Sequence, residues 1–223
     1  MLELKTYTVD EMKKYLATDR IDSINSKLQT IGCEFETKGR SKDRIYTITK
    51  LPNQFKEFCI YELGVPPQTD FDKLKNFLYY YFFSDGFFTF PIQEMENILH
   101  RVGKPVARQT FTKWISLLEN NNLIYRDDLD CVYYACCHTK EGEYYVKQIT
   151  QEEYINAWRC YFRLLNTNDK GFAYANAAMK NIVGGKAVKC PTPKANALTY
   201  DRLKTLMQLV LNEKNSDTYY ESL

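Results

Sequence analysis

Residues 21–50 read IDSINSKLQTIGCEFETKGRSKDRIYTITK, and this stretch decides the fold of the first part of the chain. Its opening third carries an isoleucine or leucine every three or four residues: Ile21, Ile24, Leu28 and Ile31. That spacing predicts one apolar stripe along a helix, which Gly32 ends. Apolar and polar residues then alternate on both sides of a loop that contains Gly39, so we expect a β-hairpin there.

The residues before this stretch complete a small domain. Apolar and polar residues alternate at positions 2–7, which is typical of a short strand. Thr8 and Glu11 have the spacing of a capping box, which predicts a helix that begins at Val9. Thr18 is expected to cap the second helix. The order strand, helix, turn, helix, hairpin is the plan of a winged helix-turn-helix domain, which we assign to residues 1–51.

Three further segments follow. Residues 52–68 contain a Pro-Pro pair and are expected to form a linker. Residues 69–148 are predicted to repeat the winged-helix plan, with two strands that form a hairpin around an Asp-rich turn at residues 127–130. Residues 149–223 are predicted to be a helical region, and Pro191 and Pro193 to exclude regular structure near them. The expected fold class is therefore α+β and mainly helical, with two small winged-helix units before a C-terminal helical region.

The composition narrows the classes of function. The 223 residues carry a formal net charge of +2, so the chain is neither a polybasic coat protein nor an acidic mimic of DNA. No apolar run reaches the roughly 18 residues that a membrane helix needs, so we expect no membrane partner. Seven scattered cysteines favour a reduced cytoplasmic protein over a disulfide scaffold.

The sequence gives no indication of a cofactor, a metal or catalysis. With two His and nine Gly, a His-based active site or a Gly-rich phosphate cradle is not expected. Cys136 and Cys137 are neighbours on a predicted strand, so their thiols should point to opposite faces rather than converge on zinc. The acids at residues 127–130 are interpreted as turn residues rather than as a magnesium site.

The first predicted unit carries a candidate DNA-reading surface. Polar and basic residues lie on the outer face of the second helix and on the hairpin loop: Ser23, Asn25, Lys27, Lys38, Arg40, Lys42 and Arg44. Such side chains can hydrogen-bond to base edges or contact phosphates. The alternative is a solvated helix face beside an ordinary hairpin.

Two later stretches are further candidates. The predicted helix at residues 107–120 has outward hydrogen-bonding residues: Arg108, Gln109, Thr112 and Lys113. Its alternative role is packing or dimerisation. Nine basic residues against two acidic ones lie between residues 159 and 204, and four lysines flank a Gly-Gly turn and the Pro-rich loop: Lys180, Lys186, Lys189 and Lys194. An exposed loop of this charge could contact phosphates, and the alternative is a solvated basic face.

Aromatic residues are abundant, at 15% of the chain. The predicted helix at residues 71–83 is apolar nearly all round, which implies burial from several sides and favours a domain interface or a homodimer. On the predicted helix that starts after Thr150, Trp158 and Phe162 are expected to face inward.

Several short motifs resemble those of tandem winged helix-turn-helix proteins of Firmicute prophages and mobile elements. They are Tyr7-Thr8-Val9-Asp10-Glu11-Met12, Lys27-Leu28-Gln29-Thr30-Ile31-Gly32, Gly39-Arg40-Ser41-Lys42, Arg108-Gln109-Thr110 and Tyr133-Tyr134. The resemblance covers about the first two thirds of the chain. It implies an accessory protein of a mobile element that acts in the cytoplasm of a low-GC bacterium.

These patterns lead to one leading hypothesis and two alternatives. The leading hypothesis is a non-enzymatic, sequence-specific protein that binds double-stranded DNA and regulates transcription or initiates replication. The first alternative is a phage-encoded inhibitor whose basic face binds a host defence nuclease or its RNA. The second, a DNA-processing enzyme, is disfavoured because no catalytic constellation is visible.

Overall fold

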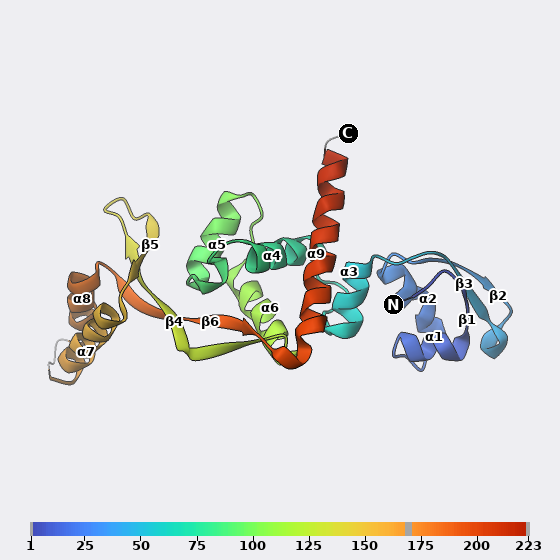
Figure 1. The fold of residues 1–223 in the computed structure, drawn as a ribbon, viewed down its shortest axis with the longest axis horizontal. Helices are drawn as coiled ribbons and strands as arrows, with labels where there is room; N and C mark the ends of the chain where they lie inside the picture. Colours follow the sequence, from blue (N-terminus) through green and yellow to red (C-terminus); the bar gives the residue numbers. More distant parts are fainter. Residues whose placement is uncertain (1, 168–170, 222–223) are drawn as a thin grey trace. The chain divides into compact units, whose positions relative to one another are not determined.

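The computed structural model describes residues 2–167 and 171–221. The chain forms two compact units, one made of Met1–Lys75 with Asp201–Leu223 and the other of Asn76–Tyr200. The described residues hold α-helices and two antiparallel three-stranded sheets (Figure 1), which confirms the α+β class. In this part of the chain, no helix combines the length and apolar composition that crossing a membrane requires.

The first unit opens with the predicted order of elements. They are β1 (Thr6–Thr8), α1 (Val9–Tyr15), α2 (Asp22–Thr30), β2 (Glu34–Lys38) and β3 (Ile45–Lys50). The strands pair in the order β1-β3-β2, and a short 3₁₀ turn at Ser41–Asp43 lies within the hairpin. The sheet and both helices therefore agree with the order expected for residues 1–51.

Local sequence signals account for most of these elements. The capping box at the start of α1 is present, because the Thr8 amide donates to Glu11 Oε2 at 2.7 Å and the Glu11 amide donates to Thr8 Oγ1. The apolar stripe of α2 is buried as predicted, with Leu28 fully inaccessible. The predicted cap of α2 was wrong: no side chain caps its first turn, and the Thr18 hydroxyl instead lies 2.7 Å from that of Ser23.

The expected linker at residues 52–68 is part of a packed core. It forms α3 (Gln54–Glu57) and a π-helical turn at Phe58–Glu62, in which Phe55 and Cys59 are buried. A chain segment that buries large apolar side chains cannot act as a free spacer.

The C-terminal helix α9 (Tyr200–Glu221) belongs to the same first unit as α3. Asn53 Nδ2 donates to Glu213 Oε1 at 3.1 Å, and the Arg202 guanidinium donates to the Glu62 carbonyl. The assignment of residues 149–223 to one C-terminal region therefore differs from the observed division. The tail from Asn212, which the sequence indicates to be frayed, continues α9 instead.

The second unit contains three helices before its sheet. They are α4 (Phe71–Phe83), of which the part from Asn76 belongs to this unit, α5 (Ile92–Arg101) and α6 (Arg108–Asn120), with a 3₁₀ turn at Phe87–Thr89. Phe77 is fully buried, and its ring centroid lies 5.2 Å from that of Phe111 and 5.3 Å from that of Trp114. This aromatic cluster anchors the inner face of α6.

The sheet of the second unit differs from the predicted hairpin. It consists of β4 (Ile124–His138), β5 (Tyr144–Ile149) and β6 (Lys186–Ala195) in the order β5-β4-β6. Residues 127–130 do not reverse the chain; they form an irregularity within the single long strand β4, which pairs with β6 on both sides of it. The predicted pairing was wrong because the partner of residues 124–136 lies some 60 residues further along the chain.

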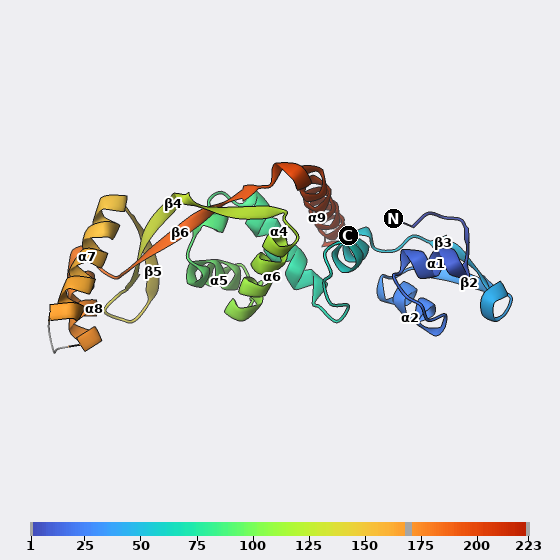
Figure 2. The same ribbon diagram turned by 90° about the horizontal axis from the view of Figure 1, so that it is seen from below.

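The strand β6 contains Pro191 and Pro193, where the sequence predicts no regular structure. That prediction was wrong, because β6 is an edge strand, and prolines are tolerated at sheet edges where their missing amide faces no partner. Figures 1 and 2 show β4 and β6 as a long two-stranded ribbon. The second unit thus differs from the predicted unit of residues 69–148, because it begins at Asn76 and β6 completes its sheet.

The segment between β5 and β6 forms a helical hairpin, α7 (Gln151–Thr167) and α8 (Gly171–Val183). Ala157 of α7 and Met179 and Val183 of α8 pack with residues of the sheet in one buried cluster. Gly185 allows the chain to enter β6, because a Cβ at this position would lie 2.1 Å from the Cys136 carbonyl oxygen. The helices therefore cover the end of the ribbon where β5 is added (Figure 1).

Candidate nucleic-acid interface

The outer face of α6 presents the residues predicted for it. Arg108, Gln109, Thr112 and Lys113 are exposed, while Phe111, Trp114, Ile115 and Leu118 are buried. A shallow concavity on this face is lined by Gln109, Thr112, Lys113 and Ser116. Positions three and four apart share one face of a helix, so a single polar surface results, which is referred to below as the α6 face. The exposed side chains of Arg108, Gln109, Thr112 and Lys113 are not part of the core.

The charge of the α6 face is basic. Arg108 and Lys113 are exposed cations, and the acid of the same helix, Glu119, forms an ion pair with Arg126 Nε at 2.5 Å. At the start of the helix the Arg108 amide donates to Glu96 Oε1 at 3.3 Å. The carboxylate that α6 itself contributes is therefore already paired with a cation, and the exposed Arg108 and Lys113 leave the α6 face able to approach a polyanion.

Two of the three α2 residues predicted to read DNA, Ser23 and Lys27, make hydrogen bonds within the fold instead. Ser23 Oγ donates to the Arg20 carbonyl at 2.8 Å. Lys27 Nζ donates to the Leu16 carbonyl at 2.7 Å, so this half-buried lysine caps the C-terminal end of α1. Asn25 is also half-buried, and its Oδ1 lacks a hydrogen-bond partner among the described residues. The expectation that Lys27 is exposed and available to phosphates was wrong.

The hairpin loop of the first unit is more accessible. Lys38, Arg40 and Lys42 are exposed, and no ion pair within the described part of the chain involves them, while Arg44 is half-buried. Gly39 has φ +88°, and a Cβ there would lie 2.5 Å from the Asp43 carbonyl oxygen. The tight turn thus depends on glycine, and it presents three cations at its tip.

The basic residues of β6 do not form a loop free of acids. Lys194 Nζ lies 2.9 Å from Asp127 Oδ2 and 3.3 Å from Asp130 Oδ2, and Lys189 Nζ lies 3.7 Å from Asp128 Oδ1. The hydrogen bond from Lys194 lowers the pKa of Asp127, and the same bond raises the pKa of Lys194. The prediction of an unneutralised basic loop was wrong, because β4 brings its three aspartates against β6.

Lys180 and Lys186 remain exposed cations and lie close together. Both line a hollow of about 320 Å³ on the surface of the second unit, together with His138 of β4 and Asn176 of α8. The four lysines predicted to form one basic surface therefore differ: Lys189 and Lys194 pair with aspartates, and Lys180 and Lys186 form no ion pair with a described residue.

Burial raises the pKa of the thiols of Cys33, Cys59, Cys136 and Cys190, which suppresses thiolate formation there. All seven are free, and burial raises the pKa of Cys33 to about 11 and that of Cys190 to about 12. Cys137 is buried in the core of the sheet, whereas Cys136 is half-buried and accepts a hydrogen bond from the Tyr144 hydroxyl at 3.3 Å. Within residues 2–167 and 171–221 no cluster of three or more His, Cys, Asp or Glu could hold a metal ion.

The helical hairpin α7–α8 exposes two phenylalanines, and one of them, Phe162, is predicted from the sequence to face inward. Phe162 is 52% exposed, and its ring stacks on that of Trp158 with the centroids 5.4 Å apart. Phe172 of α8 is 67% exposed. The prediction for Phe162 was wrong because, among the described residues of the second unit, none covers its ring sufficiently to bury it. We refer to Trp158 and Phe162, which line one shallow hollow on α7, as the aromatic surface.

Comparison of the chain with models of known protein families, with curated protein sequences and with solved structures found no match. The assignment of function therefore rests on the residues and their geometry.

Proposed function

We propose that the chain is a sequence-specific, non-enzymatic DNA-binding protein of a mobile element that acts in the cytoplasm as a transcription regulator or replication initiator. The observation that carries this proposal is the α6 face. A helix held from behind by buried aromatic rings presents arginine, glutamine, threonine and lysine to solvent at one-face spacing. These are the residue types that contact bases and phosphates in a major groove.

The elements around α6 support a winged-helix interpretation. Helices α5 and α6 are joined by a short turn, and α6 is followed by the antiparallel ribbon of β4 and β6. In this interpretation the wing is interrupted by an insertion, β5 with α7 and α8, which lies between its two strands in the sequence. The first unit contributes a second basic element, the hairpin tip with Lys38, Arg40 and Lys42.

Selection of duplexes from a randomised pool tests sequence-specific binding. The parent chain is expected to enrich one motif, and Gln109→Ala to relax the preference at a single position while the remaining positions keep theirs. Loss of a base contact of this type costs about 1–3 kcal/mol of discrimination. Lys140→Ala is the matched control, since Lys140 is an exposed cation in the β4–β5 turn, away from α6. A pool without enrichment would contradict the proposal.

A second candidate function is supported by the aromatic surface. Exposed aromatic rings on a helical hairpin are typical of protein contacts, since such rings contribute much of the energy of interfaces. The chain would then be a phage-encoded inhibitor that binds a host defence nuclease or its RNA, or this surface would join two copies as a homodimer. Under this alternative, Phe162→Ser abolishes co-purification of a nuclease complex or of a second copy, while Gln109→Ala has no effect.

A further inference from the structure

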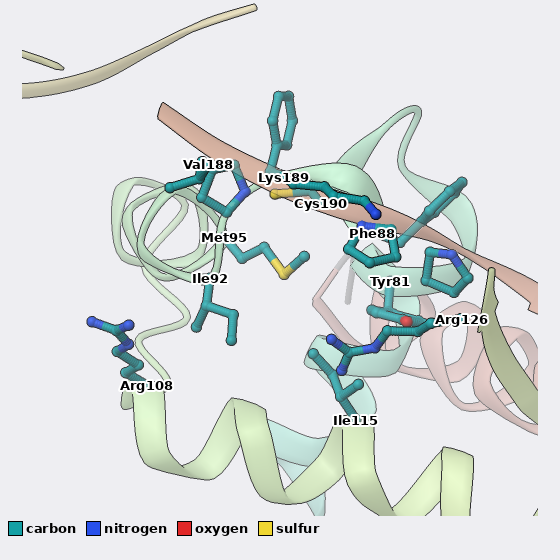
Figure 3. Close-up of a pocket in the computed structure, with 14 residues that line it drawn as sticks. Tyr81, Phe88, Ile92, Met95, Arg108, Ile115, Arg126, Val188, Lys189 and Cys190 are labelled. Carbon is teal, nitrogen blue, oxygen red and sulfur yellow. The ribbon is translucent and has the colours of Figure 1, made fainter. Parts of the chain in front are cut away.

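A pocket of about 300 Å³ lies inside the second unit, between its helices and the β4–β6 ribbon (Figure 3). Its lining comes from α4, α5, α6, β4 and β6. The volume equals that of about ten water molecules in the liquid and falls at the lower end of the range of small-molecule sites. A pocket bounded by five elements is a product of the fold and not of one loop.

The walls of this pocket are largely apolar. Its lining includes Phe88, Ile92, Met95 and Ile115, together with prolines of the Phe90–Pro91 segment and of β6. Figure 3 shows the side chains of Ile92, Met95 and Ile115 directed into the same space from two helices. Such walls favour an apolar ligand body, because its transfer from water into the pocket is favourable.

Three cations contribute to the lining, and no carboxylate does. They are Arg108 at the start of α6, Arg126 of β4 and Lys189 of β6. Figure 3 shows the Arg126 guanidinium turned towards the middle of the pocket. Its Nε pairs with Glu119, which leaves the terminal amino groups on the pocket side. Lys189 has a looser contact with Asp128, at 3.7 Å.

A buried hydroxyl in the pocket lacks a partner. Tyr81 is 3% exposed, lines the pocket, and its hydroxyl has no hydrogen-bond partner among the described residues. Burial raises the pKa of this hydroxyl, so it stays protonated and can donate. Figure 3 places its oxygen beside Arg126. A buried polar group without a partner is rare in folded proteins, and a ligand oxygen would supply the missing acceptor.

We propose that this pocket binds a small organic carboxylate with an aromatic or branched apolar body. Its carboxylate pairs with the Arg126 guanidinium and accepts from the Tyr81 hydroxyl, while its body lies against Met95 and Ile115. Because Arg108 both lines the pocket and begins α6, occupancy also changes the affinity for DNA; this second part rests on the proposed function.

A titration with 2-naphthoate and its neutral isostere 2-naphthamide tests the site without DNA. The full chain is labelled with ¹³C in its methionine methyl groups, and Met95 reports on the pocket while Met12 and Met179 lie in other clusters. We expect naphthoate to shift the Met95 signal only, and naphthamide to bind about tenfold or more weakly, because charge-assisted hydrogen bonds are the stronger ones. Arg126→Gln should remove this difference, and Arg20→Gln, at an exposed position of the first unit, should keep it.

Two results would overturn the binding site: a Met95 signal that does not move up to the solubility limit of naphthoate, or equal affinities for the two probes in the parent chain. Val188→Phe, which fills the pocket from β6, gives an independent variant and should abolish the shift in protein shown to be folded by circular dichroism. In a separate arm, naphthoate should change the affinity for the selected duplex in the parent chain but not in Val188→Phe. An unchanged affinity with ligand bound would overturn the link to DNA alone.

Discussion

Truncation of Phe111 to alanine tests how the α6 face is held in place. Phe111 is fully buried, and its ring meets that of Phe77 edge to face at a centroid distance of 5.2 Å. Removing a fully buried phenylalanine costs about 3–5 kcal/mol, a sum that includes the edge-to-face contact of roughly 0.5–1.5 kcal/mol. The free energy of unfolding of a domain is about 5–15 kcal/mol, so Phe111→Ala should still fold. It should unfold at a much lower guanidinium concentration and at a lower temperature than the parent.

Tryptophan fluorescence reports on the unfolding of the second unit alone. The chain has two tryptophans, Trp114 and Trp158, and both lie in the second unit. Guanidinium unfolding followed by the fluorescence of these residues should show the full decrease of about 3–5 kcal/mol in the free energy of unfolding. Thermal unfolding should show a decrease in Tm of about 6–20 °C. The neighbouring Thr112→Ala is the control, because Thr112 is exposed and its loss should change stability by no more than about 0.5 kcal/mol. Equal transitions for both variants would refute the placement of Phe111 behind the α6 face.

Two further predictions concern the first unit. Glu57 is buried, accepts from the Leu2 amide and the Tyr15 hydroxyl, and burial raises its pKa above the ordinary value of 4.5. A raised carboxyl pKa means that the folded state holds the proton more tightly, so this group's contribution to stability is present at low pH and lost as the pH rises through the raised value. Relative to Glu57→Gln, the parent should therefore lose stability as the pH rises above 4.5, in unfolding followed by circular dichroism. A difference in stability that does not depend on pH would contradict this. Lys27→Ala should lower the free energy of unfolding by about 1 kcal/mol, because the half-exposed ammonium no longer donates to the Leu16 and Ala17 carbonyls. Unchanged stability would show that these two hydrogen bonds contribute nothing.

The elements that the sequence predicts correctly are those whose structure is decided by local signals. The capping box of α1, the apolar stripe of α2 and the inner face of α6 each depend on residues within one or two helical turns. Leu28 is predicted from spacing alone to lie inside, and it is fully buried. The α6 face follows from the same periodicity, since the residues opposite a buried stripe must face solvent.

Contacts between residues far apart in the chain could not be predicted from the sequence. The pairing of β4 with β6 joins residues about 60 positions apart, and Pro191 and Pro193 argue locally against a strand. The same pairing brings Asp127 to Lys194, so two charge runs that look independent in the sequence neutralise each other. The pocket beside α6 also could not be predicted, because its walls come from five elements.

The predicted face of α2 shows a different kind of failure. The periodicity correctly places Lys27 off the buried stripe, but it cannot tell whether a neighbouring helix end occupies that side. The carbonyls of Leu16 and Ala17 do so, and they accept the ammonium that was expected to contact phosphate. Phe162 is the converse case, an apolar residue at inward spacing that no element of its unit covers.

The salt dependence of DNA binding by Lys113→Ala tests the central claim most directly. Lys113 is an exposed cation in the middle of the α6 face, and its removal leaves the buried side of the helix intact. If α6 lies against the duplex, the slope of log K against log salt concentration should become shallower by about one, with weaker binding to every sequence. A slope and an affinity equal to those of the parent, on the selected duplex and on unrelated DNA alike, would contradict the assignment of α6 as the DNA-binding helix.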